Sequence, residues 1–278
     1  MRTRKTKSPK QAPFLDDSRD MSGPTSLTDL IRIQDRIPEE KRVGGNYSHV
    51  SALVGDFCAR REVLARRHNV SLSETASGSM RVVWALGRAA ESHVRKQLAA
   101  MMQGNMYGEW ECRCGHTREQ GFYAPVVCPR CSTTPENYVE LKCVDDEAMV
   151  TGSPDLIWFH DGEFHIVEVK SIKSDDFKAL LAPKVIHVHQ AICYVRLFRA
   201  MGHQVSNQVR VIYVSKDAVA TVPYKEFTGE YDHAFTEMLW EDARAAKGEV
   251  LPPRLPVCSN AMTPTARGCG LCVNCFLT

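Results

Sequence analysis

The sequence lacks any long hydrophobic run: among its 278 residues there is no stretch of about 18 apolar residues that could cross a bilayer. The first residues are basic and contain proline, without the apolar core of a secretory signal. We therefore expect a cytoplasmic protein without a membrane segment. A strong charge of one sign is also lacking, because the net charge is only +2. Any contact with nucleic acid would have to come from local basic patches.

Cysteine, in contrast, is abundant, with eleven residues. In a chain without secretory features, clustered thiols bind metals more often than they form disulfides. The hydrophobic share of 44% is enough for one globular domain with a core. Residues 1–26 lack hydrophobic periodicity and are rich in charge and proline, which predicts a disordered basic arm that either touches phosphates or is only solvated. The ordered domain is expected over 27–278.

Periodicity predicts both helices and strands along the chain, and we expect an α/β fold. The expected helices cover 27–36, a stretch from about 48 to 64 that contains Cys58, 80–102, 184–201 and 227–247. The expected strands cover 139–144, 147–159, 164–172 and 208–215. In the second long helix the apolar stripe comprises Val83, Leu86, Ala90 and Val94. Residues 105–138 have no periodicity and are expected to form an inserted zinc-binding loop, and 250–278 form a second cysteine-rich segment.

Two apolar runs flank Asp161-Gly162, which is a strong signal for a two-residue β-hairpin turn. In such a hairpin, paired residues have numbers that sum to 323, so Asp155 lies directly opposite Glu168. Their Cβ atoms would be about 5 Å apart. Lys170 is two residues beyond Glu168 and points to the same face. Three ionisable groups are therefore expected to converge.

Two carboxylates beside a covered sheet repel each other and are desolvated, and a bound divalent cation would offset both effects. Magnesium or manganese suits these oxygen ligands. Such a cation would activate water and stabilise the charge on a phosphate, while Lys170 would orient the nucleophile or stabilise the transition state. The expected reaction is phosphodiester hydrolysis. The alternative is a hairpin whose Asp155 and Glu168 only form salt bridges with Lys170.

These residues carry a resemblance to a known family. The segments Gly152-Ser-Pro-Asp155 and Glu168-Val-Lys170 resemble the two central motifs of the PD-(D/E)xK nuclease superfamily. Gly87-Arg-Ala-Ala-Glu91 further resembles a helix motif of the RecB-like exonucleases, including the CRISPR-associated and AddB-type members.

The resemblance implies a central mixed sheet flanked by helices, and it implies site residues beyond the hairpin. It implies that Glu91 binds a metal together with Asp155, Glu168 and Val169. His93 is the rival of Glu91, because the two lie about 200° apart on a helix and only one can face the site.

A third motif of these exonucleases, a glutamine followed four residues later by a tyrosine, is matched by Gln190 and Tyr194. The two residues lie one turn apart on one helix face. The resemblance implies that they contact DNA or the active-site lysine. An ordinary amphipathic helix would account for Tyr194 alone.

The first cysteine cluster consists of Cys112, Cys114, Cys128 and Cys131. Two close pairs separated by thirteen residues resemble a zinc ribbon, and four thiolates suit tetrahedral zinc. His116 could replace one thiolate. Because four protein ligands leave zinc no open position, the expected role is structural.

The second cluster consists of Cys258, Cys269, Cys272 and Cys275, and its spacing suits an iron–sulfur cluster. In the iron–sulfur branch of RecB-like nucleases, one further cysteine precedes the nuclease motifs, and Cys58 resembles it. This implies a structural [4Fe–4S] cluster on Cys58, Cys269, Cys272 and Cys275, with Cys258 as an alternative ligand. The last spacing departs from that branch, and zinc is the alternative metal.

The resemblance implies a magnesium- or manganese-dependent exonuclease that acts on single-stranded DNA or DNA ends, in replication or recombination and with other proteins of those processes as partners. A bacteriophage gene, expressed in a bacterial cytoplasm, is the expected setting. Two alternatives share the fold: a structure-specific endonuclease with the same site, and a DNA-binding adaptor that does not cut.

Overall fold

The computed structural model describes residues 47–55, 57–70, 72, 78–116, 118–123, 127–135, 137–216 and 223–277, all within one compact unit, Glu40–Thr278. The arm expected at 1–26 and the helix expected at 27–36 lie outside the described residues. Across the described ranges, no helix is both long enough and apolar enough to cross a membrane.

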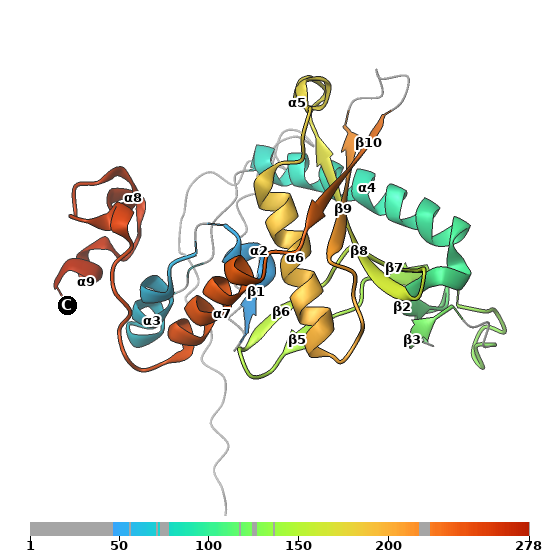
Figure 1. The fold of residues 1–278 in the computed structure, drawn as a ribbon, viewed down its shortest axis with the longest axis horizontal. Helices are drawn as coiled ribbons and strands as arrows, with labels where there is room; N and C mark the ends of the chain where they lie inside the picture. Colours follow the sequence, from blue (N-terminus) through green and yellow to red (C-terminus); the bar gives the residue numbers. More distant parts are fainter. Residues whose placement is uncertain are drawn as a thin grey trace, which may run out of the picture. The chain divides into compact units, whose positions relative to one another are not determined.

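A mixed sheet forms the centre of the fold (Figure 1). Its strands follow the order β10 (Tyr224–Glu230), β9 (Gln208–Ser215), β8 (Glu163–Ile172), β7 (Leu156–His160), β2 (Met106–Glu111) and β3 (Arg118–Phe122), and β4 (Asn137–Val139) also pairs with β2. Strands β8 and β9 are parallel, and the other neighbours are antiparallel. A smaller sheet has the order β1 (Ser48–His49), β6 (Val150–Gly152) and β5 (Cys143–Asp145).

Helices cover both faces of the central sheet. Helix α4 (Gly78–Met101) packs against Leu156, Val167 and Val169, whereas α6 (Val185–Ala200) packs against Ile157 and Ile166. Successive strand residues point to opposite faces, so β7 and β8 are apolar on both sides because each side has its own helix. This arrangement confirms the expected α/β class with a central mixed sheet.

The remaining helices are short or lie towards the ends of the described chain. They are α2 (Val50–Leu53), α3 (Ala59–Arg67), η1 (Gln103–Asn105), α5 (Ser174–Ala179), α7 (His233–Lys247), η2 (Pro256–Cys258), α8 (Pro264–Gly268) and α9 (Cys272–Leu277). Arg66 of α3 donates to the main-chain oxygens of Ala246 and Gly248, which tethers α3 to the end of α7. Helix α3 also contacts α9, so residues from both ends of the described chain lie side by side.

The single helix expected from 48 to 64 is wrong. The chain forms β1 and α2, leaves helical geometry around Gly55, and begins α3 at Ala59 with Cys58 as its N-cap. The helical spacing of apolar residues continues across the break because each short helix buries its own apolar side chains. Leu53 of α2 and Leu64 of α3 belong to separate hydrophobic clusters. Glycine is a poor helix former, and it marks the break.

Two other expected elements need correction. The helix expected at 227–247 begins only at His233, because 224–230 pairs with β9 along its whole length as β10, and the Asp232 side chain caps the helix by accepting from Phe235 N at 3.0 Å. Residues 105–138, expected to be an irregular loop, contain β2 and β3 of the central sheet. Gly108 interrupts the alternation of β2, and it is needed there because a Cβ would lie 2.4 Å from the Tyr138 ring.

Helix α4 matches the helix expected at 80–102, but its apolar stripe is only half buried. Val94 is buried and Ala90 is partly buried, whereas Val83 and Leu86 are 39% and 61% exposed. The helix meets the end of β8 at Gly87, where a Cβ would lie 2.9 Å from Ser171 Oγ. The two turns before Gly87 therefore lack this strand beneath them.

Candidate active site and cysteine clusters

The hairpin register expected from Asp161-Gly162 is confirmed. Leu156 pairs with Val167 and the ladder continues to His160 and Glu163, so paired numbers sum to 323. Both turn residues have positive φ, 50° at Asp161 and 84° at Gly162, as a two-residue turn of type I′ requires. The ladder begins one residue after Asp155, which places this residue beside Glu168 at the end of the strand pair.

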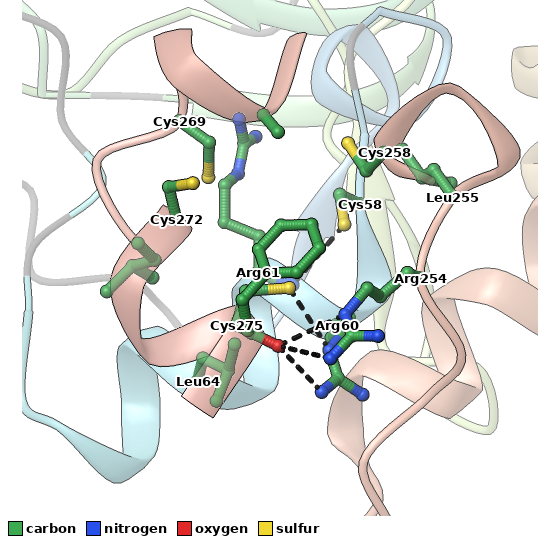
Figure 2. A pocket seen from close by; sticks show the side chains of 13 residues that line it. Cys58, Arg60, Arg61, Leu64, Arg254, Leu255, Cys258, Cys269, Cys272 and Cys275 are labelled. Atoms are coloured by element: carbon green, nitrogen blue, oxygen red, sulfur yellow. Dashed lines mark hydrogen bonds between the residues drawn. The ribbon is translucent and has the colours of Figure 1, made fainter. Parts of the chain in front are cut away.

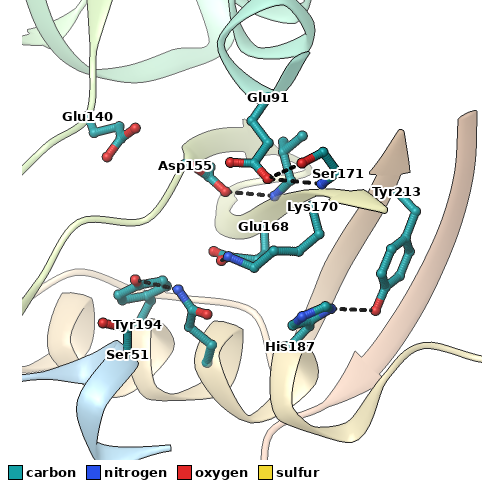
Figure 3. A network of polar contacts seen from close by, with 12 residues as sticks. Ser51, Glu91, Glu140, Asp155, Glu168, Lys170, Ser171, His187, Tyr194 and Tyr213 are labelled. Carbon is teal, nitrogen blue, oxygen red and sulfur yellow. Dashed lines mark hydrogen bonds and ion pairs between the residues drawn. The ribbon is translucent and has the colours of Figure 1, made fainter. Parts of the chain in front are cut away.

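Three ionisable side chains meet at this end of the hairpin (Figure 3). Glu168 and Lys170 extend to the same side of β8 and form an ion pair. The Asp155 carboxylate accepts a hydrogen bond from Val169 N through Oδ2 at 2.7 Å. Glu168 is 1% exposed and Asp155 is 8% exposed. The site is therefore a buried pair of carboxylates with one ammonium group.

Burial and mutual repulsion shift the pKa values in this group. Desolvation, and then the charge of Asp155, raise the pKa of Glu168 to about 8. Desolvation also raises the pKa of Asp155, against the opposite effects of Lys170 and Arg95. Burial lowers the pKa of Lys170, but the charges of Glu168 and Asp155 outweigh this effect and leave that pKa raised. The lysine therefore keeps its proton at neutral pH.

The carboxyl oxygens of Asp155 and Glu168 are donors of the kind that a divalent cation prefers, but in this structure the ligand atoms of Glu91, Asp155 and Glu168 do not all lie within 4.8 Å of one another. Glu168 Oε2 is buried and has no hydrogen-bond partner among the described residues. A buried carboxyl oxygen without a partner is costly in a protein interior. A second carboxylate lies across the hairpin, and oxygen donors of this kind suit magnesium, manganese or calcium.

Replacing Glu168 with glutamine is expected to change how stability depends on pH. Between about pH 4.5 and pH 8 the folded protein holds a proton on Glu168 that the unfolded chain has released, so its contribution to the free energy of unfolding falls as the pH rises through this window. An amide does not titrate. We expect the melting temperature of Glu168→Gln, measured relative to that of the wild type, to rise by roughly 10 °C between about pH 5 and pH 9.

Differential scanning fluorimetry without added divalent ions measures this difference. Glu147→Gln, at an exposed position, is the control and should follow the wild-type curve at every pH. Parallel curves for wild type and Glu168→Gln would show that the buried carboxyl group is not the source of the pH dependence.

Glu91 reaches the site from α4. Its Oε1 accepts hydrogen bonds from Ser171 N at 2.9 Å and Ser171 Oγ at 2.8 Å. The close approach depends on Gly87, where a Cβ would lie 2.9 Å from Ser171 Oγ and 3.3 Å from Lys216 Nζ. His93 is exposed, so of the two candidates Glu91 is the one that faces β8.

Arg95 and Glu140 belong to the same network, and the sequence reasoning missed both. Arg95 Nη1 lies 2.5 Å from Asp155 Oδ1 and 2.9 Å from Glu140 Oε1. Arg95 could have been found, because it lies one turn after Glu91 on the same face of α4. Glu140 had no local signal: it follows the short strand β4 and reaches the site only through the pairing of β4 with β2.

Gln190 and Tyr194 both belong to α6, and Tyr194 lies below Glu168 in Figure 3. Gln190 Nε2 donates to the Tyr194 hydroxyl at 2.9 Å, as their spacing of one turn allows. The Tyr194 ring packs against Gly152, where a Cβ would lie 2.6 Å from its Cε1 atom. Desolvation and then the charge of Glu168 raise the pKa of Tyr194, so the hydroxyl stays neutral. Gly152 of the Gly-Ser-Pro-Asp segment thus makes room for the tyrosine of the helix motif.

The four sulfur atoms of the first cysteine cluster converge. Cys112 Sγ lies 3.3 Å from Cys114 Sγ and 3.4 Å from Cys128 Sγ, Cys114 Sγ lies 3.7 Å from Cys128 Sγ, and the Cys131 sulfur atom completes a group whose members all lie within 4.8 Å. Tetrahedral zinc with 2.3 Å bonds places its sulfur ligands about 3.8 Å apart, so the group is compatible with zinc. His116 is not part of it.

The second set of cysteines surrounds one cavity (Figure 2). Its lining includes all five candidates, namely Cys58, Cys258, Cys269, Cys272 and Cys275. Their sulfur atoms are spread more widely than in the first cluster, because among the described residues no three of them lie within 4.8 Å of one another. The separation exceeds what one tetrahedral zinc ion needs and suits a larger multi-iron group.

Positively charged side chains surround this cavity and donate to its wall. Arg60 Nε lies 3.2 Å from Cys275 Sγ, and the main-chain N of Arg61 lies 3.4 Å from Cys58 Sγ. Arg254 donates to the main-chain oxygen of Cys275 at 3.1 and 3.2 Å. Thiolates are stabilised by such donors, so the wall fits an anionic group held by cysteine sulfur.

Comparison with family models finds no match, and comparison with curated proteins finds none either. Among solved structures, the chain is similar to the protein SSO0001, with 17% identity and a TM-score of 0.41 over 90% of this chain and 96% of that one. It is also similar to an alkaline exonuclease, LHK-Exo, from Laribacter hongkongensis, with 15% identity and a TM-score of 0.39, and to LHK-Exo in complex with dAMP, with 13% identity and a TM-score of 0.39. Both of these similarities cover 72% of this chain and 86% of that one.

Proposed function

We propose that this chain is a divalent-metal-dependent DNA nuclease that hydrolyses phosphodiester bonds at Asp155, Glu168 and Lys170. The observation that carries the proposal is the meeting of two buried carboxylates and one ammonium group at the end of the hairpin, with Glu168 Oε2 lacking a hydrogen-bond partner in the described part of the chain. In a hairpin held only by salt bridges we would expect both oxygens of a buried carboxyl group to have partners, and Glu168 Oε2 has none among the described residues.

The proposed ligands of magnesium or manganese are Asp155, Glu168, Glu91 and the main-chain oxygen of Val169. When bound, the cation supplies Lewis-acid activation of water and neutralises phosphate charge. The protein residues position the reacting groups. Arg95 holds Asp155 Oδ1 at 2.5 Å, and Val169 N holds Oδ2 at 2.7 Å, so this carboxylate is fixed before any ligand arrives.

Lys170 is the proposed source of positive charge beside the reacting phosphate. Its raised pKa keeps it protonated at neutral pH, and its ion pair with Glu168 fixes its position. From there the ammonium group orients the attacking water or stabilises the negative charge that develops on the phosphate oxygens. Tyr194 and Gln190 form a neutral hydrogen-bonded pair near Glu168, whose charge is one cause of the raised pKa of Tyr194.

For the cysteine clusters we propose structural zinc on Cys112, Cys114, Cys128 and Cys131, and a [4Fe–4S] cluster in the second cavity. Four of Cys58, Cys269, Cys272, Cys275 and Cys258 would bind the iron–sulfur cluster. The sulfur atoms of the first group are close enough together for one zinc ion, whereas those of the second group are more widely spaced around a cavity. This difference favours zinc in the first group and the iron–sulfur cluster in the second.

The proposed substrate is single-stranded DNA or a DNA end, attacked as an exonuclease in replication or recombination. The decisive assay uses linear single-stranded, linear duplex and circular single-stranded DNA, each with magnesium or manganese, with Asp155→Asn as the inactive control. We expect linear single strands to be degraded and circles to survive. Cleavage of the circles would indicate an endonuclease, and failure to cut any substrate would favour the DNA-binding adaptor.

A further inference from the structure

The first turns of α4 carry apolar side chains that the fold leaves exposed. Between residues 80 and 86 the exposed large side chains are Met80 at 43%, Val82 at 57%, Val83 at 39%, Trp84 at 44% and Leu86 at 61%. This segment precedes Gly87, the residue at which α4 meets the end of β8. An exposed apolar segment of this density beside a candidate active site indicates a binding surface.

One face of this segment continues directly into the active site. At about 100° per residue, Trp84, Arg88, Glu91 and Arg95 fall within an arc of about 60° on α4. Glu91 binds Ser171 and Arg95 holds Asp155. Trp84 and Arg88 therefore occupy the same helix face as two residues of the site, and Trp84 lies two turns, or about 10 Å, before Glu91.

The same face carries positive charge. Arg88 is exposed and forms no ion pair with any residue in the described ranges. Lys216 Nζ lies 3.3 Å from the position that a Cβ of Gly87 would occupy, so a second cation borders the helix between Arg88 and the sheet. An exposed indole followed one turn later by an unpaired guanidinium group is complementary to a nucleotide, which offers a flat base and a phosphate.

We propose that Trp84 and Arg88 form a track for an unpaired nucleic-acid strand that leads to the active site. Trp84 stacks on a base and Arg88 binds a neighbouring phosphate, which delivers the strand to Glu91 and the carboxylate pair. This inference rests on the proposed function and adds the residues outside the carboxylate site that bind the unpaired strand. A duplex would not use the track, because its bases are stacked on each other and their faces are hidden.

Exposed apolar side chains on opposite sides of α4 distinguish binding of a nucleic-acid strand from docking of a protein partner. Leu86 is more exposed than Trp84, but it lies about 160° away around the helix, on the other side. A protein partner that covers the exposed segment for its apolar surface would use Leu86 as well. A stacked strand would use Trp84 and leave Leu86 in water. Leu86→Ala is therefore a matched control for Trp84→Ala, and Lys96→Ala, an exposed cation off the track, is the control for Arg88→Ala.

The experiment measures binding of a fluorescein-labelled oligothymidylate to the full chain without added divalent ions, in an Asp155→Asn background, so that cleavage plays no part. We expect Trp84→Ala to weaken binding about tenfold. Arg88→Ala should lower the slope of log affinity against log salt by about one. Leu86→Ala and Lys96→Ala should each change the affinity less than twofold. Trp84→Phe should retain most of the affinity while removing the quenching of tryptophan fluorescence on binding.

Loss of affinity in Leu86→Ala equal to that in Trp84→Ala would overturn the proposal in favour of a general apolar docking face. Unchanged binding in both Trp84→Ala and Arg88→Ala would overturn it outright. Equal effects on duplex and single-stranded DNA would overturn the stacking role. Because no step requires hydrolysis, Trp84-dependent binding by a chain that cuts no DNA would refute the proposed nuclease and leave the track in place, whereas cleavage without Trp84 dependence would do the reverse.

Discussion

Replacing Lys170 with methionine is expected to lower the rate of DNA cleavage about a thousandfold, with the fold intact. Methionine keeps most of the volume of the side chain but removes the ammonium group that pairs with Glu168. A positioned charge at a developing negative centre contributes a factor of this size in other enzymes. The measurement is the single-turnover rate on an end-labelled oligonucleotide at saturating manganese, so that weaker substrate binding does not enter.

Lys173→Met is the matched control, because Lys173 follows three residues later and is exposed. Its cleavage rate should stay within twofold of the wild type. Circular dichroism and the melting temperature of Lys170→Met show whether the fold persists. Equal cleavage by the wild type and Lys170→Met would remove Lys170 from the reaction, and with it the assignment of the hairpin as the active site.

Replacing Cys58 with serine is expected to remove iron from the protein and to lower its melting temperature by on the order of 10 °C. Cys58 precedes α3, whereas the other candidate ligands lie in the last twenty-one residues of the chain, so a shared metal group closes a loop of more than 200 residues. Cys58 Sγ also accepts a hydrogen bond from Arg61 N at the start of α3. Serine is a good helix cap and preserves this function, so a loss of stability reports on the metal group.

Metal analysis separates the two cysteine clusters. Cys58→Ser should lose iron and the brown absorbance and keep zinc, whereas Cys128→Ser should lose zinc and keep iron. The melting temperature of Cys258→Ser compared with Cys58→Ser shows which of these two neighbours is the ligand. A Cys58→Ser protein with the wild-type spectrum and melting temperature would contradict the proposed cluster.

The features that were read correctly from the sequence are local. The hairpin register follows from the Asp161-Gly162 turn and the period of two in the flanking strands, and the structure has the same pairing. The spacing of Gln190 and Tyr194 on one helix face likewise follows from 3.6 residues per turn. In each case the relevant partners are near neighbours in the chain, or are related through one tight turn, so backbone geometry alone relates their positions.

The expectations that failed depended on distant partners. The segment 224–230 forms a strand because every one of its residues pairs with β9. The helix predicted from residue 227 took no account of this pairing partner. The zinc-loop region contributes β2 to the sheet because β7 pairs with it, although Gly108 weakens its alternation. Val83 and Leu86 have helical spacing but are exposed. Both precede Gly87, the position at which α4 first comes close to the end of β8.

The sequence by itself determined the hairpin, its facing carboxylates and lysine, and the grouping of cysteines into two sets, because turns, strand alternation and close spacing act over a few residues. The tertiary structure alone decided that Arg95 and Glu140 join Asp155, and that Glu91 and not His93 faces β8. It also decided that the five candidate ligands of the second cluster, Cys58, Cys258, Cys269, Cys272 and Cys275, line one cavity. These contacts join residues tens to hundreds of positions apart. Which of them form depends on how the helices and strands pack, and no local pattern records that packing.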